Sequence, residues 1–305
     1  MIRFDGRTAI VTGAGNGLGR SHALMLAERG CNVVVNDLGG SVSGVGASVS
    51  AAQAVVDEII AAGGKAIAHG ANVTKADEVA DMVETAIKTF GAVDILVNNA
   101  GILRDKSFSK MTEEDFRLVV DVHLMGSMIC TKAVWDHMKE RNYGRIAMTS
   151  SSSGIYGNFG QSNYGAAKMG LVGLMNVLQI EGAKYDIRVN TLSPTAHTRM
   201  TEGLIPEAAL KLMTPESVSA GLVYLVSEDA PKRTILAAGA GGYAAAKIYE
   251  TPGLYLPPED QTPDKVAEHF AGIVNAEGQE ELTDGSGQTL KFLAYAAKHF
   301  GVKLG

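Results

Sequence analysis

Three residues, Ser151, Tyr164 and Lys168, have the chemical types and the spacing needed to move a proton at an alcohol oxygen. Tyr164 and Lys168 lie four residues apart in a segment of helical period, so both side chains project from one helix face. A free tyrosine has a pKa of about 10, but a neighbouring ammonium stabilises the phenolate and lowers that pKa. Ser151, 13 residues before Tyr164, can polarise a substrate oxygen. Alone, such a tyrosine–lysine pair is more often part of a solvated helix face.

A glycine-rich loop, Thr12–Gly19, joins an apolar run to the start of a helical segment. Glycine lets the backbone approach a phosphate closely, and the helix N-terminus behind the loop supplies free N–H groups and a partial positive charge. The loop therefore predicts a dinucleotide site, and the alternative is a tight structural turn. The residues expected to line this site are Gly13, Asn16, Gly17, Leu18 and Gly19.

The second apolar run ends at Asp37, which lies 18 residues after Gly19. A carboxylate at this position accepts a hydrogen bond from the adenosine ribose 2′-OH and repels a 2′-phosphate. Neither Asn16 nor Leu38 is a cation that would bind such a phosphate. The sequence therefore favours NAD over NADP, and the alternative is that Asp37 caps a turn.

Short apolar runs alternate with longer segments of helical period along the chain. The runs are continuously apolar, as expected for strands covered on both faces. This alternation predicts an α/β fold with a Rossmann-type doubly wound parallel sheet of about seven strands and a C-terminal extension. The expected strands are Thr8–Thr12, Asn32–Asn36, Lys65–Ala68, Val93–Asn98, Arg145–Ser150, Arg188–Leu192 and Thr234–Ala238. The expected helices are Leu18–Arg29, Ser48–Ala62, Lys75–Phe90, Glu113–Met138, Gln161–Lys184 and Pro215–Ser227.

Proline usage divides the chain, because the first 193 residues contain none and four prolines fall in Thr251–Pro263. That stretch predicts an extended connector, followed by helices near Asp264–Asn275 and Thr289–Phe300. We expect residues 1–242 to form the dinucleotide-binding domain with the catalytic residues. Residues 243–305 are expected to form an extension too short to hold an independent core comfortably.

Composition excludes several classes of protein. The chain has 305 residues, is 46% hydrophobic and 20% charged, and carries a net charge of −6 without charged blocks, so no nucleic-acid partner is expected. No apolar leader and no run of 18 apolar residues is visible, so no membrane span is expected. The two cysteines, Cys31 and Cys130, exclude a disulfide framework and fit a reduced, cytoplasmic setting.

The glycine loop, read as Thr-Gly-x-x-x-Gly-x-Gly, resembles that of the short-chain dehydrogenase/reductase family. The segment Asn98–Gly101 is similar to the family's Asn-Asn-Ala-Gly motif beside the cofactor, which adds Asn99, Ala100 and Gly101 to the expected cofactor residues. Asn72 and Val73 stand where the family usually has Asp-Val at the adenine. The family's serine–tyrosine interval selects Ser151 among its neighbouring serines, and the resemblance implies a Ser151, Tyr164 and Lys168 catalytic set.

Two positions depart from the family pattern. His123 stands where the family often has an asparagine that acts chiefly through its main-chain carbonyl, so we expect His123 to contribute its backbone before its side chain. After the sixth expected strand the family's Pro-Gly is replaced by Pro194-Thr195. The resemblance still implies that Ala196 and Thr198 contact the nicotinamide end of the cofactor.

Several stretches resemble one branch of the family, the (3R)-hydroxyacyl-CoA dehydrogenase units of peroxisomal multifunctional enzymes. These stretches are Asn36–Gly40, Gly101–Asp105, Val122–Leu124 and Gly154–Gln161. The resemblance implies NAD-dependent oxidation of a (3R)-3-hydroxyacyl-CoA, with Tyr164 as the base, Lys168 lowering its pKa and Ser151 steadying the carbonyl oxygen. It also implies an extension that packs at a dimer interface and shapes the substrate pocket. Because no hydratase or carrier-protein part is present, a stand-alone bacterial homologue is expected.

Other functions remain compatible with the same residues. The catalytic set does not distinguish an acyl-CoA from a steroid-like substrate, another secondary alcohol or a 3-oxoacyl carrier-protein substrate. A non-catalytic NAD-binding regulator would typically have lost the tyrosine or the lysine, and both are present. The resemblance further implies a homodimer or homotetramer paired through the long helical segments Glu113–Met138 and Gln161–Lys184.

Overall fold

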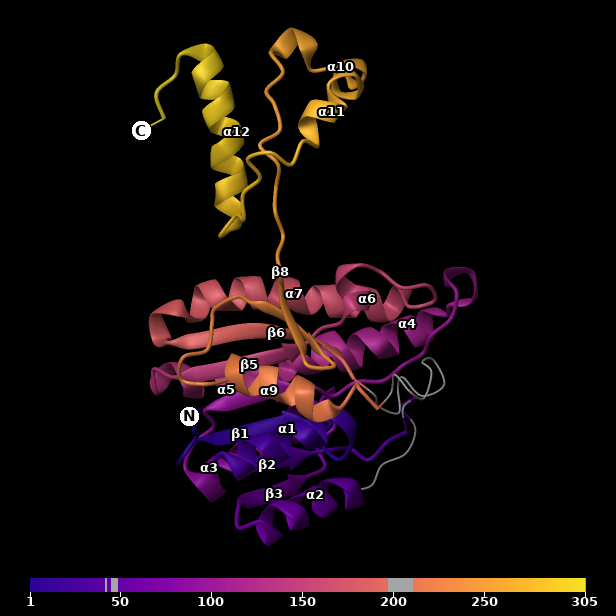
Figure 1. Ribbon diagram of the computed structural model, residues 1–305, viewed down its shortest axis with the longest axis vertical. Helices are drawn as coiled ribbons and strands as arrows, with labels where there is room; N and C mark the ends of the chain where they lie inside the picture. The colour runs from indigo at the N-terminus through magenta and orange to yellow at the C-terminus, as the bar shows by residue number, and fades with distance from the viewer. Residues whose placement is uncertain (42, 45–48, 197–210, 305) are drawn as a thin grey trace. The chain divides into compact units, whose positions relative to one another are not determined.

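The computed structural model describes residues 1–41, 43–44, 49–196 and 211–304, which belong to two compact units (Figure 1). The first unit spans Met1–Ala245 and the second spans Ala246–Gly305. The candidate catalytic and cofactor residues all belong to the first unit, so its sheet determines where they lie.

The first unit is built on an eight-stranded sheet of order β3-β2-β1-β4-β5-β6-β7-β8 (Figure 1). The strands from β1 to β7 pair in parallel, and every residue of β1, β4 and β5 is buried, which explains why their sequences are mostly apolar. The strand order reverses between β1 and β4, where doubly wound sheets bind their ligands at the carboxyl ends of the strands. The bounds are β1 Thr8–Thr12, β2 Asn32–Asn36, β3 Lys65–His69, β4 Ile95–Asn98, β5 Gly144–Thr149, β6 Ile187–Thr195, β7 Ile235–Gly239 and β8 Gly242–Ala246.

The predicted fold class is confirmed, but the predicted strand number is one too low. The additional strand, β8, follows β7 through a two-residue turn, Ala240-Gly241, in which both residues have positive φ (49° and 78°). Such a turn joins antiparallel strands and usually contains Asn-Gly or Asp-Gly. This strand lacks the usual sequence signals of a hairpin. Its turn contains an alanine in place of asparagine or aspartate, and the strand itself is rich in glycine and alanine and largely exposed.

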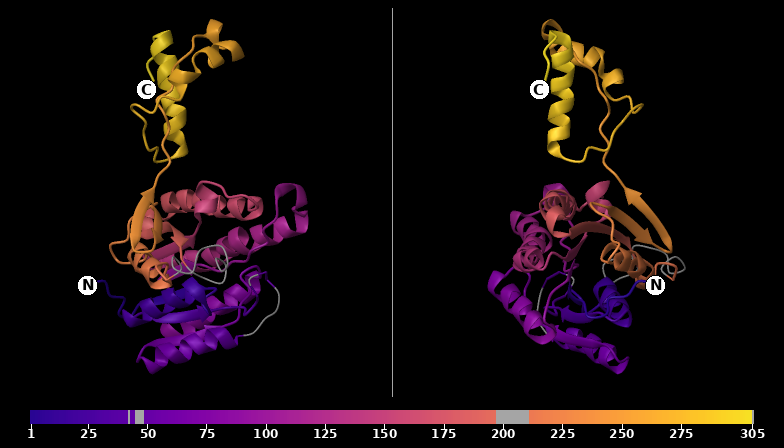
Figure 2. Two further views of the ribbon diagram at one scale, coloured as in Figure 1. Left: turned by 45° about the vertical axis from the view of Figure 1, so that its right-hand side comes forward. Right: turned by 90° about the vertical axis from the view of Figure 1, so that its left-hand side faces the viewer.

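Helices cover both faces of the sheet (Figure 2). α1 packs against α2 and α9 on one face, and α5 packs against α3 and α7 on the other. The bounds are α1 Gly17–Glu28, α2 Ser50–Ala61, α3 Ala76–Phe90, α5 Gly126–Glu140, α6 Ser152–Ile155, α7 Ser162–Gly182 and α9 Pro215–Leu225. The short 3₁₀ turns are η1 Phe108–Lys110, η3 Ala183–Tyr185 and η4 Pro258–Asp260.

The helix expected over Glu113–Met138 is interrupted by a π-helical turn. It consists of α4 (Glu113–Val120), the turn η2 (Asp121–Met125) and α5. Within the described chain, only this continuous stretch, Glu113–Glu140, is long and apolar enough to cross a membrane. The core helices of soluble proteins pass the same test, and here α4 and α5 pack against α7, so it is weak evidence for a span.

Several polar contacts join the elements of the second unit. Lys291 pairs with Glu250, Lys247 pairs with Glu281 at 2.6 Å, and the Tyr295 hydroxyl donates to the Pro252 carbonyl at 2.9 Å. Its helices, α10 (Pro263–Glu268), α11 (Phe270–Ile273) and α12 (Gly285–Phe300), contain no buried residue. The unit therefore has no apolar core of its own among the described residues.

Gly173 offers a test of how α7 is stabilised. It is exposed in the middle of α7, has ordinary helical φ, and an added Cβ would have no neighbour within 4 Å. Because glycine in a helix interior is less favourable than alanine, Gly173→Ala should raise the free energy of unfolding by roughly 0.5–1 kcal/mol.

Urea unfolding of the two proteins measures this difference. The matched control is Gly170→Ala in the same helix, where the Cβ would lie 3.0 Å from Leu124 Cδ2 and offset the gain. Equal changes in both variants would show that the space around the glycine has no part in the effect.

Candidate active site

The parallel sheet gathers most of the predicted site residues around one cavity of about 300 Å³. They come from the carboxyl ends of β1, β2, β3 and β4, from the start of α1 and from the helices η2 and α7. The predicted residues that line this cavity are Gly13, Asn16, Gly17, Leu18, Gly19, Asp37, Asn72, Val73, Asn99, Ala100, Gly101, His123, Tyr164 and Lys168.

Asn99 joins the glycine loop to the end of β4. Its side-chain amide donates to the carbonyls of Thr12 and Gly13, both at 3.0 Å. The Thr12 hydroxyl in turn accepts from the backbone N–H of Asn99 and of Ala100. The approach is so close that a Cβ on Gly13 would lie 2.8 Å from Ala100 Cα, so only glycine fits there.

The beginning of α1 fits a dinucleotide phosphate. Asn16 is the N-cap, its side chain makes no capping hydrogen bond, and the first turn holds no acidic residue. The N–H groups and the positive end of the helix dipole therefore remain available to an anion. Gly19 lies under the loop, where a Cβ would come within 2.2 Å of the Gly13 carbonyl oxygen.

The Asp37 carboxylate is fixed by two backbone donors. The N–H of Gly15 donates to Oδ2 and the N–H of Gly39 donates to Oδ1, both at 2.7 Å. Among the described residues that line the cavity, Lys168 is the only lysine or arginine. An ordered carboxylate with no cation beside it suits a ribose 2′-OH better than a 2′-phosphate. Sequence reasoning passed over Gly15, although it belongs to the same glycine-rich segment.

Asn72 forms a local turn at the end of β3. Its Oδ1 accepts from both the N–H and the hydroxyl of Thr74, at 3.0 and 2.9 Å. The cavity is thus lined at this end by an ordered amide beside the buried Val73.

Lys168 is buried on the inner face of α7. Its Nζ donates to the carbonyl oxygen of Thr149 at the end of β5, and lies 5.3 Å from the centroid of the Tyr164 ring. Ser151 lies two residues beyond the end of β5 and caps α6 by accepting from the Ser153 N–H at 3.1 Å, and its side chain is close enough to Tyr164 to act on the pKa of that phenol. The three predicted catalytic residues therefore meet where β5 ends.

Burial dominates the electrostatics of this group. It raises the pKa of Tyr164 to about 12, a change that the hydrogen bond from Ser151 partly opposes. It lowers the pKa of Lys168 to about 7. In the protein without cofactor or substrate, burial therefore sets the direction of both pKa changes, and the lowering of the Tyr164 pKa by a charged Lys168 stays a prediction.

The side chain of His123 contacts the residues around the cavity, although its backbone was expected to matter more. Its Nε2 lies 3.1 Å from the Ile102 nitrogen and 2.8 Å from the Ile102 oxygen, so one tautomer accepts and the other donates. The ring meets the Tyr164 ring edge to face at 5.1 Å, and burial together with Lys168 holds the pKa of His123 well below its ordinary value. Its carbonyl, expected to act at the site, accepts from the Ser127 hydroxyl at 2.6 Å.

The remaining predicted site residues do not line the cavity or lie outside the described residues. Ser151 and the buried Ala196 do not line the cavity, whereas Pro194 of β6 does. Thr198 lies outside the described residues. Sequence reasoning also missed Thr149 and Ile102, which act through main-chain oxygens that no residue type reveals.

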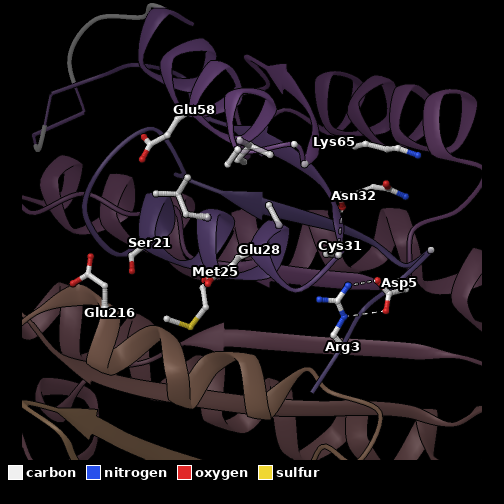
Figure 3. Close-up of a pocket in the computed structure, with 18 residues that line it drawn as sticks. Arg3, Asp5, Ser21, Met25, Glu28, Cys31, Asn32, Glu58, Lys65 and Glu216 are labelled. Carbon is white, nitrogen blue, oxygen red and sulfur yellow. Dashed lines mark hydrogen bonds and ion pairs between the residues drawn. The ribbon is translucent and has the colours of Figure 1, made fainter. Parts of the chain in front are cut away.

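A second cavity, of about 830 Å³, lies near the opposite end of the sheet (Figure 3). It is lined by residues before β1 and at the start of β2, and by α1 and α2. Arg3 pairs with Asp5 beside it, and Glu58 pairs with Arg20. It contains none of the glycine loop or the catalytic residues, so size alone does not locate the site.

The fold, the glycine loop and the Ser151, Tyr164 and Lys168 group together define a nucleotide-dependent oxidoreductase. Residues 7–208 match the short chain dehydrogenase family model. The chain therefore belongs to that family, whose members act on CH–OH groups.

Three known proteins illustrate the relationship. The chain is 47% identical to peroxisomal multifunctional enzyme type 2 of Drosophila melanogaster over 95% of its own length, but spans only about half (52%) of that enzyme. The full-length structure of that enzyme superposes with a TM-score of 0.82 at 39% identity, covering 98% of this chain and 51% of that one. A putative short-chain type dehydrogenase/reductase of Mycobacterium tuberculosis is 45% identical, covering 91% of this chain and 97% of that protein. A 7α-hydroxysteroid dehydrogenase complexed with NADH and 7-oxo glycochenodeoxycholic acid has a TM-score of 0.71 at 30% identity, covering 79% and 95% of the two chains.

The low pKa of Lys168 predicts a specific dependence of stability on pH. Because the folded-state pKa, about 7, lies below that of the unfolded chain, burying the ammonium costs most below pH 7, and the cost is relieved as the pH rises towards 10. Lys168→Met should therefore be more stable than the wild type at pH 7, with the difference shrinking by pH 9.5.

Urea unfolding at a series of pH values measures the difference. Lys132→Met, an exposed substitution in α5, corrects for the lost charge. A Lys168→Met difference that is constant with pH would contradict the assigned burial of the ammonium.

Proposed function

We propose that the protein is an NAD-dependent dehydrogenase that oxidises a (3R)-3-hydroxyacyl-CoA to the 3-oxoacyl-CoA. The observation that carries this proposal is the meeting of Ser151, Tyr164 and Lys168 beside a cavity lined by the glycine loop and Asp37. The similarity to the multifunctional enzyme over 95% of this chain supports the acyl-CoA substrate.

The chain's own groups supply proton transfer and positioning. Tyr164 takes the proton of the substrate hydroxyl, and Ser151 donates a hydrogen bond that stabilises the developing carbonyl oxygen. Lys168, in its charged form, stabilises the phenolate and holds the nicotinamide ribose. When NAD is bound, its nicotinamide supplies the acceptor for the hydride. His123 keeps Ile102 and the Tyr164 ring in place.

Tyr164→Phe separates chemistry from binding. It removes the hydroxyl while keeping the ring that packs against His123. Turnover should fall by about 100- to 10,000-fold, the range expected when a general acid–base group is lost.

Initial rates and fluorescence titration with NADH give the two readouts. NADH affinity should be largely unchanged, because the ring that lines the cavity remains. Turnover retained in this variant would sink the catalytic assignment.

Asp37 is proposed to select NAD. Asp37→Ser removes the carboxylate while leaving a small polar side chain, so affinity for NADH should fall on the order of tenfold and that for NADPH should rise, because 2′-phosphate repulsion is lost. Asp57→Ser, at an exposed carboxylate of α2, controls for net charge. The same NADH-to-NADPH affinity ratio in the Asp37 variant and the wild type would contradict this role.

Two other substrates remain as alternatives. The structural similarity to a 7α-hydroxysteroid dehydrogenase favours a steroid alcohol as the second candidate. A 3-oxoacyl carrier-protein substrate would use the same catalytic residues. Initial rates with 3-hydroxyacyl-CoAs of graded chain length, steroid alcohols and a carrier-protein thioester separate the three.

We further propose that the protein acts in the cytoplasm as a homodimer or homotetramer. The second unit contributes dimer contacts and substrate choice in this proposal. Its exposed apolar side chains, such as Phe270, Leu290 and Phe300, support a role in contacts, because the unit lacks a core that would bury them.

A further inference from the structure

Arg104 lies just beyond the Asn98–Gly101 segment and contacts two separate parts of the first unit. Its Nε donates to the Ser43 carbonyl oxygen at 2.9 Å, and its Nη1 donates to Asp115 Oδ1 at 3.0 Å. The Arg104 side chain is 30% exposed and that of Asp115 is 7% exposed. Arg104 does not itself line the cofactor cavity.

Ser43 belongs to the stretch of chain that forms one wall of the cavity. We call Leu38, Gly40, Ser41 and Gly44 the cavity wall, since all four line the cavity. An added Cβ on Gly44 would be 3.3 Å from Ile102 Cγ2, so the wall lies directly against the segment that carries Arg104.

The main chain of Arg104 is tied to the catalytic helix. Its carbonyl oxygen accepts from Asn163 Nδ2 at 3.1 Å, and Asn163 Oδ1 accepts from the N–H of Tyr164 at 2.8 Å. Asn163 is fully buried, so this connection has no competition from water. Arg104 therefore binds the Ser43 carbonyl oxygen with its side chain, and its own carbonyl oxygen binds Asn163, the residue that precedes Tyr164 in α7.

We propose that Arg104 is a positioning residue that holds the cavity wall in register with the catalytic helix and so increases affinity for the dinucleotide. The inference rests on the proposed use of NAD. A planar guanidinium can direct separate N–H groups at a carbonyl and a carboxylate at once, which the single ammonium of lysine does less well. The charge of Arg104 alone is therefore insufficient for this task.

Lys106 provides a matched comparison. Its Nζ pairs with Asp115 Oδ2 at 2.6 Å, and its backbone N–H donates to the Gly160 carbonyl oxygen. No described contact joins it to Ser43. Because each cation pairs with a different oxygen of Asp115, loss of either leaves that buried carboxylate with a partner.

The test compares Arg104→Gln, Arg104→Lys and Lys106→Met in the 305-residue chain. The dissociation constant of NADH is measured by fluorescence, alongside the thermal midpoint, kcat and the KM for NAD. Both Arg104 variants should weaken NADH binding about five- to tenfold, through loss of the hydrogen bond to Ser43. KM for NAD should rise with little change in kcat, and Lys106→Met should stay within about twofold of the wild type.

Equal weakening in Arg104→Gln and Lys106→Met, or full affinity in Arg104→Lys, would overturn the inference, because the ion pair with Asp115 would then explain the effect. Wild-type affinity in Arg104→Gln would overturn it as well. Failure of the wild type itself to bind NADH would instead contradict the proposed function.

Discussion

The two side-chain protons of Asn99 are shared between the carbonyls of Thr12 and Gly13, and the Thr12 hydroxyl accepts from the N–H groups beyond β4. These bonds lock the carboxyl ends of β1 and β4 together at the point where the strand order reverses. On one side they fix the glycine loop and the start of α1. On the other side they fix the segment after β4, in which Ile102 contacts His123 and Arg104 contacts Asn163 of α7. The same hydrogen bonds thus position both the proposed cofactor-binding residues and the proposed catalytic residues.

The second constraint is the low polarity around Tyr164 and Lys168. Burial raises the pKa of Tyr164 and lowers that of Lys168, so the neutral form of each group is stabilised relative to its charged form. A charged Lys168 near Tyr164 is therefore costly in the protein alone, and the fold must bear that cost. Active sites commonly hold such groups at the expense of stability, because a group that is easily displaced from its ordinary pKa is useful in proton transfer.

Much of the fold was predictable from hydrophobic pattern, because continuously apolar strands and long helices leave clear periods in the sequence. β8 was missed because its turn contains Ala240 rather than asparagine, and α6 because four residues are too few to show a period. The residues that line the candidate cofactor cavity were predictable where chemistry demands a residue type, as at Gly13 and Asp37. The pairing of His123 with the Ile102 backbone and the direction of the pKa change at Tyr164 were not, because both depend on burial and on contacts between residues distant in sequence.

The stereochemistry of the reaction is the most direct test of the proposed (3R)-3-hydroxyacyl-CoA dehydrogenase activity. Initial rates of NAD reduction are compared for the (3R) and (3S) forms of one 3-hydroxyacyl-CoA, with NADP in place of NAD as a second pair of assays. We expect NAD to be reduced with the (3R) substrate on the order of a hundredfold faster than with the (3S) substrate, and NADP to be used little. Equal rates with both stereoisomers, or reduction supported only by NADP, would contradict the proposed activity.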